Sequence, residues 1–155
     1  MLNEQGGYRI VEYEPSYEDG VKIVIGKVLK GIGVLPDLEG PVDDEDLSKI
    51  LEIYSGRGNF WVALERGRVI GTVAIRDMGG ETAKLNRMFV LIDYHGKGVG
   101  QALFEKALSF AKKQGFKKLI LNTHTLMSRA HHFYEKNGFR RIRQDNDKYY
   151  YELNL

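Results

Sequence analysis

The chain has 155 residues, of which 43% are hydrophobic and 28% charged, and its formal net charge is only +2. This length fits a single domain over residues 1–155, and the small charge without a basic block argues against a dedicated nucleic-acid binder. Cysteine is absent, which excludes disulfides, thiolate metal sites and a cysteine nucleophile. Neither a secretory signal nor an apolar run of membrane-spanning length is visible, so we expect a cytoplasmic protein without a membrane partner.

The N-terminal part of the chain predicts one strand and two helices. Residues 8–15 alternate like a strand that stops at a proline, and residues 16–34 carry apolar side chains at helical spacing. A loop over 35–47, rich in proline, glycine and acidic residues, leads into a second amphipathic helix over 44–55.

The remainder predicts three strands followed by alternating helices and strands. Residues 59–78 divide at "ERGR" into two strand-like runs and residues 81–92 form a third, a pattern typical of an antiparallel meander. The later elements are a helix over 101–115, a strand over 116–124, a helix over 128–138 and strands over 139–143 and 147–155.

Between the meander and the next helix stands "YHGKGVGQAL", with glycines at 96, 98 and 100. The first turn of a helix has N–H groups without intrahelical partners, so an anion can dock there when no Cβ atoms hold it away. The segment therefore indicates a phosphate or diphosphate cradle, or alternatively a tight turn that needs glycine for its conformation alone. A Walker loop is absent, and a dinucleotide fingerprint would need glycine where Gln101 stands.

Two motifs occur at a characteristic separation: "HGKGVG" at 95–100, preceded by "MFV", and "AHHFYEKNGF" at 130–139. In these motifs and in the order of its elements, the chain resembles the GNAT superfamily of acetyl-CoA-dependent N-acetyltransferases, most specifically over residues 85–139. The resemblance implies an α/β (α+β) fold. Its sheet would be mixed but mainly antiparallel, with seven strands, splayed between the fourth and fifth strands and flanked by about four helices.

The resemblance also implies acetyl-CoA as cosubstrate and suggests where it binds. Amides at the glycine segment would hold the diphosphate, and the fourth strand would pair with the pantetheine arm. His95 stands where the family usually has Arg or Gln, and Met127 where it often has Asn, for which Asn122 or Ser128 could substitute. The expected cofactor-binding residues are Met88, Val90, His95, Gly96, Lys97, Gly98, Val99, Gly100 and Asn122.

For catalysis, the resemblance assigns Tyr134 as the general acid. A phenol with a pKa of about 10 can protonate the thiolate that leaves; the alternative is an aromatic ring that only packs beneath its helix. The N–H of Val90 is the expected donor to the oxyanion. Lys84 stands where some members have a catalytic glutamate, so the base stays open among Glu81, Asn86, His124 and water.

We expect acetyl transfer to a primary amine of a small molecule by direct attack in a ternary complex. The alternatives are a protein N-terminal or lysyl acceptor, a longer acyl donor, or an acyl-CoA-binding regulatory module without turnover. Family members are often homodimers, so a homodimer is expected. No metal is expected, because cysteine and an H-E-x-x-H motif are absent and adjacent histidines on a helix point about 100° apart.

An acidic run in the first long loop is either a solvated segment or a wall of the acceptor site that attracts a cationic amine. Its members are Asp37, Glu39, Asp43, Asp44, Glu45 and Asp46.

Overall fold

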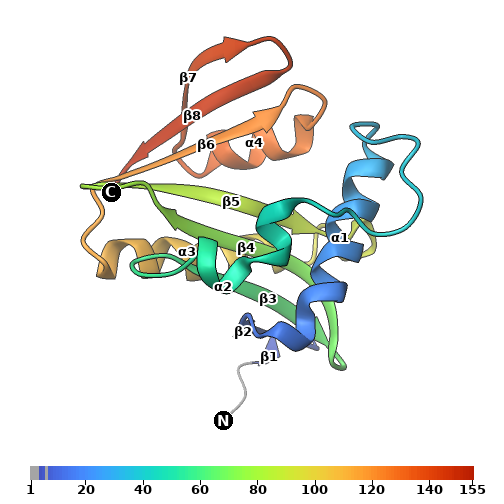
Figure 1. The fold of residues 1–155 in the computed structure, drawn as a ribbon. Helices are drawn as coiled ribbons and strands as arrows, with labels where there is room; N and C mark the ends of the chain where they lie inside the picture. The colour runs from blue at the N-terminus through green and yellow to red at the C-terminus, as the bar shows by residue number, and fades with distance from the viewer. Residues whose placement is uncertain (1–3, 6) are drawn as a thin grey trace.

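The computed structural model describes residues 4, 5 and 7–155, which form one mixed sheet with helices on both faces (Figure 1). The strands are β1 (Glu4–Gln5), β2 (Tyr8–Glu12), β3 (Asn59–Glu65), β4 (Arg68–Asp77), β5 (Thr82–Val90), β6 (Lys118–His124), β7 (Arg140–Asp145) and β8 (Lys148–Asn154). The α-helices are α1 (Glu18–Gly31), α2 (Ile50–Ile53), α3 (Val99–Lys113) and α4 (Ser128–Lys136). Short 3₁₀ turns occupy η1 (Pro15–Tyr17), η2 (Glu45–Ser48) and η3 (Ile92–Tyr94).

The predicted fold class is confirmed: a mainly antiparallel sheet with one parallel pairing and four helices, to which the two-residue strand β1 is added at one edge. The strand order is β1-β2-β3-β4-β5-β6-β8-β7, so the fourth and fifth strands expected from the sequence are β5 and β6. The predicted helix over 44–55 is instead two short pieces, η2 and α2. They are separated by Lys49, whose backbone angles (φ −135°, ψ 36°) are not helical.

The sheet separates two hydrophobic cores. On one face, α3 and α4 pack over strand residues such as Trp61, Leu85 and Tyr151. On the other face, α1 and the η2–α2 segment pack over residues such as Phe60 and Leu64. Among the described helices, none combines the length and the apolar character needed to cross a bilayer.

The splay lies between β5 and β6. These two strands are parallel and pair only through Thr82–Lys118, Ala83–Leu119 and Lys84–Ile120. In contrast, β4 continues to pair with β5 as far as Val90. The second half of β5 is therefore hydrogen-bonded on one edge, and its other edge faces the gap between the diverging strands.

A β-bulge interrupts β5 within this unpaired stretch. The β4–β5 register shifts between Thr72 and Ala74, and Arg87 takes a left-handed conformation (φ +53°), which is uncommon for a residue with a side chain. The Thr72 hydroxyl donates a hydrogen bond of 2.7 Å to the Arg87 carbonyl oxygen. This extra residue changes which side chains of β5 face α3.

The Arg87 side chain fastens the bulge to η2. Its guanidinium donates to both carboxylate oxygens of Asp46 (3.0 and 2.7 Å) and to Asp44 (2.8 Å), and the Tyr54 hydroxyl donates to Asp46 (2.8 Å). The Arg87 and Asp46 side chains are only 20% and 22% exposed, so water screens this ion pair incompletely.

Replacing Asp46 by Asn should destabilise the fold in a pH-dependent way. Burial alone would raise the pKa of Asp46, but the hydrogen bonds and charge of Arg87 outweigh burial and hold that pKa below its usual range. A carboxyl whose pKa is lowered by folding stabilises the fold above its unfolded pKa of about 4 and loses this contribution as the pH falls. We expect Asp46→Asn to lower the free energy of unfolding by about 2 kcal/mol at pH 7.

Urea denaturation of both proteins at pH 7 and at lower pH measures this difference. It should shrink as the pH falls toward 3, and the exposed control Asp37→Asn should change stability by less than about 0.5 kcal/mol. An equal loss at every pH would contradict an ionic role for Asp46.

Candidate active site

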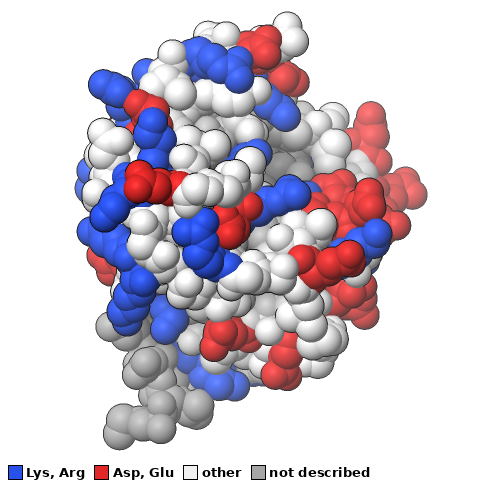
Figure 2. Space-filling view, turned by 60° about the vertical axis from the view of Figure 1, so that its left-hand side comes forward, with Lys and Arg blue, Asp and Glu red and all other residues white. Residues whose placement is uncertain are grey.

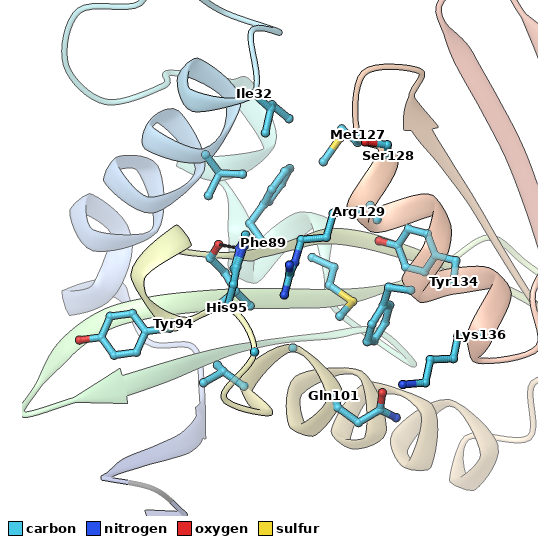
Figure 3. A pocket seen from close by; sticks show the side chains of 18 of the residues that line it. Ile32, Phe89, Tyr94, His95, Gln101, Met127, Ser128, Arg129, Tyr134 and Lys136 are labelled. Atoms are coloured by element: carbon cyan, nitrogen blue, oxygen red, sulfur yellow. Dashed lines mark hydrogen bonds between the residues drawn. The ribbon is translucent and has the colours of Figure 1, made fainter.

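A cavity of about 420 Å³ lies between β5, the glycine segment, α3 and α4, and the C-terminal end of α1 reaches it (Figure 3). Its lining is mostly apolar, with polar groups at the glycine segment and on α4. The lining includes residues of β5 (Met88, Phe89, Val90), of the glycine segment and α3 (His95, Gly96, Gly98, Val99, Gly100, Gln101) and of α4 with its preceding loop (Met127, Ser128, Arg129, Phe133, Tyr134, Lys136).

The structure brings eight of the ten predicted site residues into the lining of this one cavity. The two that lie elsewhere are Lys97 and Asn122. The Lys97 ammonium nitrogen is 5.4 Å from the centroid of the Tyr94 ring. Asn122 projects from β6 on the face away from α4, because its neighbour Leu121 packs into the α3–α4 core and side chains alternate along a strand.

The glycine segment has the conformation that its sequence suggests. Gly96 (φ +75°) and Gly98 (φ +83°) are left-handed, so glycine is favoured there for backbone reasons. Gly100 is different: it lies in the first turn of α3 with ordinary helical geometry. A Cβ atom built on it would lie 3.8 Å from Met88 and Val90, an ordinary contact. Neither conformation nor packing within the described protein explains Gly100, whereas a ligand at the cavity would.

The amides of this segment can receive an anion. The first-turn N–H groups of α3 have no intrahelical acceptors, and the N-cap residue Gly98 has no side chain to accept them. The helix also places partial positive charge at this end. The arrangement therefore fits the diphosphate that the sequence predicts.

The backbone of Val90 faces the gap between the strands. Leu91 donates its N–H to the Ile70 carbonyl on β4 (3.0 Å), and bonding directions alternate along an antiparallel strand, so the N–H and carbonyl of Val90 point away from β4. The Val90 carbonyl is already engaged, because His95 Nε2 lies 2.9 Å from it. A carbonyl can only accept, so Nε2 carries the proton, and His95 anchors the glycine segment to β5.

Tyr134 lies on α4 with its hydroxyl directed into the cavity (Figure 3). The ring is buried against Phe133, Phe139 and Tyr151. Burial raises the pKa of Tyr134 well above its usual range, so its hydroxyl keeps its proton at neutral and moderately alkaline pH. The ring therefore packs beneath its helix while the hydroxyl reaches the cavity, and the role of Tyr134 as general acid stays a prediction.

Sequence reasoning missed two cations of the lining, Arg129 and Lys136. Arg129 extends from the first turn of α4 into the cavity, and Lys136 lies at its α3 side (Figure 3). Gln101 donates a hydrogen bond of 3.0 Å to Asn137, which ties the start of α3 to the end of α4 near Lys136. Both cations lie in or beside "AHHFYEKNGF", a signal that could have revealed them.

None of the three candidate bases belongs to the described lining of the cavity. Asn86 donates to the Tyr54 hydroxyl (3.3 Å), and His124 lies 3.3 Å from the Asp147 carboxylate and accepts the Leu126 N–H. Glu81 precedes β5, and its carbonyl accepts the Lys117 N–H at the closed end of the splay. These positions do not single out a base.

Most of the acidic run is engaged within the protein. Asp43 pairs with Lys22 (3.4 Å), Glu45 with Lys49 (3.2 Å), and Asp44 and Asp46 with Arg87. This pairing weakens the reason for expecting a cationic acceptor. Within the described part of the chain, no group of three or more metal-ligating side chains could hold an ion.

The family model described as "Acetyltransferase (GNAT) domain" matches residues 56–141. The chain is 31% identical over 123 residues to "Uncharacterized N-acetyltransferase YjgM" from Escherichia coli. The alignment covers 77% of this chain and 74% of that protein. It is also 36% identical over 89 residues to "N-acetylaspartate synthetase" from Danio rerio, and this alignment covers 57% of this chain. The match spans only 32% of that longer relative.

Solved structures share the fold along almost the whole chain. A GNAT-family acetyltransferase from Staphylococcus aureus superposes with a TM-score of 0.85 at 26% identity and covers 96% of this chain and 99% of its own. The PaiA N-acetyltransferase of Thermoplasma acidophilum, solved in complex with coenzyme A, has a TM-score of 0.74 at 20% identity. The superposition with PaiA covers 96% of this chain and 99% of the PaiA chain.

Gly100→Ala separates a binding role of this glycine from a structural one. Alanine favours a helix by up to about 1 kcal/mol over glycine, and its methyl group has room. We therefore expect an unchanged or higher melting temperature together with a coenzyme A affinity weakened about tenfold or more, because the methyl group occupies the mouth of the cradle.

Calorimetric titration with coenzyme A and a thermal melt give both readouts. Ser109→Ala, an exposed position on the same helix, serves as the matched control and should leave coenzyme A affinity unchanged. If Gly100→Ala bound coenzyme A as tightly as the wild type, the cradle would not lie at the first turn of α3.

Proposed function

The chain belongs to the GNAT family of acetyltransferases, and we propose that it transfers an acetyl group from acetyl-CoA to the primary amine of a small molecule within a ternary complex. The observation that carries the proposal is the convergence, in one cavity, of an anion-accepting helix start, the open edge of β5 and the Tyr134 hydroxyl.

The cofactor would be held by both backbone and side chains. Amides of Gly98, Val99 and Gly100 would bind the diphosphate, with Arg129 and Lys136 adding positive charge. The apolar wall at Met88 and Phe133 suits the pantetheine arm, which would lie along the open edge of β5. The lining includes no carboxylate among the described residues, so nothing there repels the phosphates.

Acetyl-CoA supplies the acetyl group as a thioester, whose carbon–sulfur bond breaks as the acceptor nitrogen bonds to the carbonyl carbon. The protein would stabilise the charge that develops in this reaction and would donate and accept the protons that it moves. The Val90 N–H would stabilise the oxygen that becomes negative. Tyr134 would give its proton to the departing sulfur, and water would remove the proton that the acceptor nitrogen loses.

The comparisons support a small-molecule acceptor. One relative is named for the synthesis of an acetylated amino acid, although this chain matches only about a third of that protein's length. A protein N-terminal or lysyl acceptor and a non-catalytic acyl-CoA-binding module are the alternatives. A homodimer and a cytoplasmic location stay predictions.

Tyr134→Phe tests whether the protein is a catalyst. The variant keeps the buried ring and removes only the proton donor, so kcat should fall about 100-fold while coenzyme A affinity stays unchanged. The assay is thiol release from acetyl-CoA with an amine panel. Tyr149→Phe, which removes a hydroxyl outside the lining of the cavity, should retain wild-type kcat. Equal turnover of Tyr134→Phe and wild type would reject Tyr134 as the acid, and no turnover by wild type with any acceptor would favour a binding module.

The pH dependence of kcat provides a separate test. An acid acts only below its pKa, and burial raises the pKa of Tyr134, so loss of its proton moves to higher pH than for a free phenol at about 10. We expect kcat to show no decline between pH 8 and pH 9.5 after subtraction of uncatalysed thioester hydrolysis. A fall within this range that is absent in Tyr134→Phe would show a lowered pKa instead.

A further inference from the structure

Two cations stand directly opposite each other on the sheet face that lies away from α3. Arg76 of β4 is the cross-strand partner of Lys84 of β5. Their neighbours Ile75 and Leu85 pack into the α3–α4 core, so alternation directs Arg76 and Lys84 to the other face. Like charges at directly opposed positions destabilise a sheet, which makes the pair costly unless an anion lies close to it.

A third cation shares this face. Tyr149 and Tyr151 pack against the α3–α4 core, so Lys148 of β8 projects to the opposite side. Burial, together with the positive charges of Arg76, Lys148 and Arg87, lowers the pKa of Lys84. We call Arg76, Lys84 and Lys148 the basic cluster.

Within the described part of the chain the basic cluster is not neutralised, although charged residues around it are paired. Arg87 forms ion pairs with Asp44 and Asp46. Glu152, on the same face as the basic cluster, forms ion pairs with Lys118 and Arg140. Among the described residues, no carboxylate comes within 4.0 Å of a member of the basic cluster. Figure 2 shows the separation of charge: acidic residues gather on one side of the view and basic residues over the other side and the top.

The basic cluster lies beside the splay. Lys84 forms the last β5–β6 pair, with Ile120, and the strands diverge beyond it. The cavity on the α3–α4 side is the proposed place of the cofactor, so a second substrate must reach the gap from the opposite face. On that face it would meet Lys84 and, on the neighbouring strands, Asn122 and Tyr150, which are themselves a cross-strand pair.

We propose that the basic cluster binds a carboxylate of the acceptor, so that the preferred acceptor is an anionic amine such as an amino acid rather than a polyamine. This inference rests on the proposed acetyl transfer and adds its substrate class. It replaces the expectation of a cationic acceptor, since the acids behind that expectation are largely paired within the protein. The electrostatic repulsion between the opposed Arg76 and Lys84 would then be offset by the carboxylate of the bound substrate.

The first test compares acceptors at saturating acetyl-CoA. The panel contains L-aspartate, L-glutamate and glycine as carboxylate-bearing amines, their amidated counterparts L-aspartamide, L-glutamamide and glycinamide, and spermidine. We expect kcat/KM for the best carboxylate-bearing acceptor to exceed that of its amidated counterpart and of spermidine by about 10- to 100-fold. Preference for spermidine or for an amide would overturn the inference while leaving acetyl transfer established. Failure of every amine, with coenzyme A still bound, would instead reject the proposed function.

The second test changes the basic cluster. Lys84→Gln should raise KM for the best anionic acceptor about tenfold or more with a smaller effect on kcat, and Lys84→Arg should restore most of the affinity. Because the substitution removes a like-charge pair, Lys84→Gln should also melt at the same or a higher temperature than wild type, which separates binding from folding. The control Lys112→Gln, an exposed lysine at the end of α3, should leave KM unchanged. Unchanged KM in both Lys84→Gln and Lys148→Gln would overturn the inference.

Discussion

The early end of the β5–β6 pairing is the constraint on which the site depends. Only three residue pairs join these strands, and they lie at one end of β5. Had the pairing continued, the N–H and carbonyl of Val90 would be hydrogen-bonded within the sheet and β6 would fill the space of the cavity. The sheet instead gives up a few ladder hydrogen bonds and gains an open strand edge, which water or a ligand can satisfy.

The elements around the gap hold it in shape from both sides. On the α3 side, His95 joins the glycine segment to Val90, and Gln101 joins α3 to the end of α4. On the other side, Arg87 joins the bulge of β5 to η2. These contacts add to the packing of Met88, Val99 and Tyr134 in or against the α3–α4 core.

The two mouths of the gap differ in chemistry, and this difference matches the two substrates proposed. The α3–α4 side offers helix-start amides, Arg129 and Lys136 to a long phosphorylated carrier. The opposite face offers the basic cluster, whose members have no carboxylate within 4.0 Å among the residues that the structure describes. The proposed sites at both mouths are cationic, which would suit two anionic molecules whose reactive ends are neutral or can become so.

The sequence predicted features that depend on neighbours along the chain, and it failed where distant segments meet. The left-handed glycines at 96 and 98 and the element order could be anticipated, because turn chemistry and periodicity are local signals. The division of the 44–55 helix at Lys49 was not anticipated. Nor were the Arg87 bulge with its η2 carboxylates, the bond from His95 to Val90 and the opposed Arg76–Lys84 pair. The bulge and the opposed pair require the register or packing of separate segments, which no periodicity reveals. The bond from His95 to Val90 is local in sequence, but it depends on the irregular turn between them.

The central claim is that a diphosphate carrier binds at the first turn of α3 and along the open edge of β5. Residue-resolved amide NMR with coenzyme A would test this claim most directly. Titration of the isotope-labelled protein should shift the amide resonances of Gly98, Val99, Gly100 and Val90 and slow their hydrogen exchange, while the paired amides of β3 stay unchanged. Saturable binding with shifts confined to other segments, or no shifts at millimolar coenzyme A, would contradict the account.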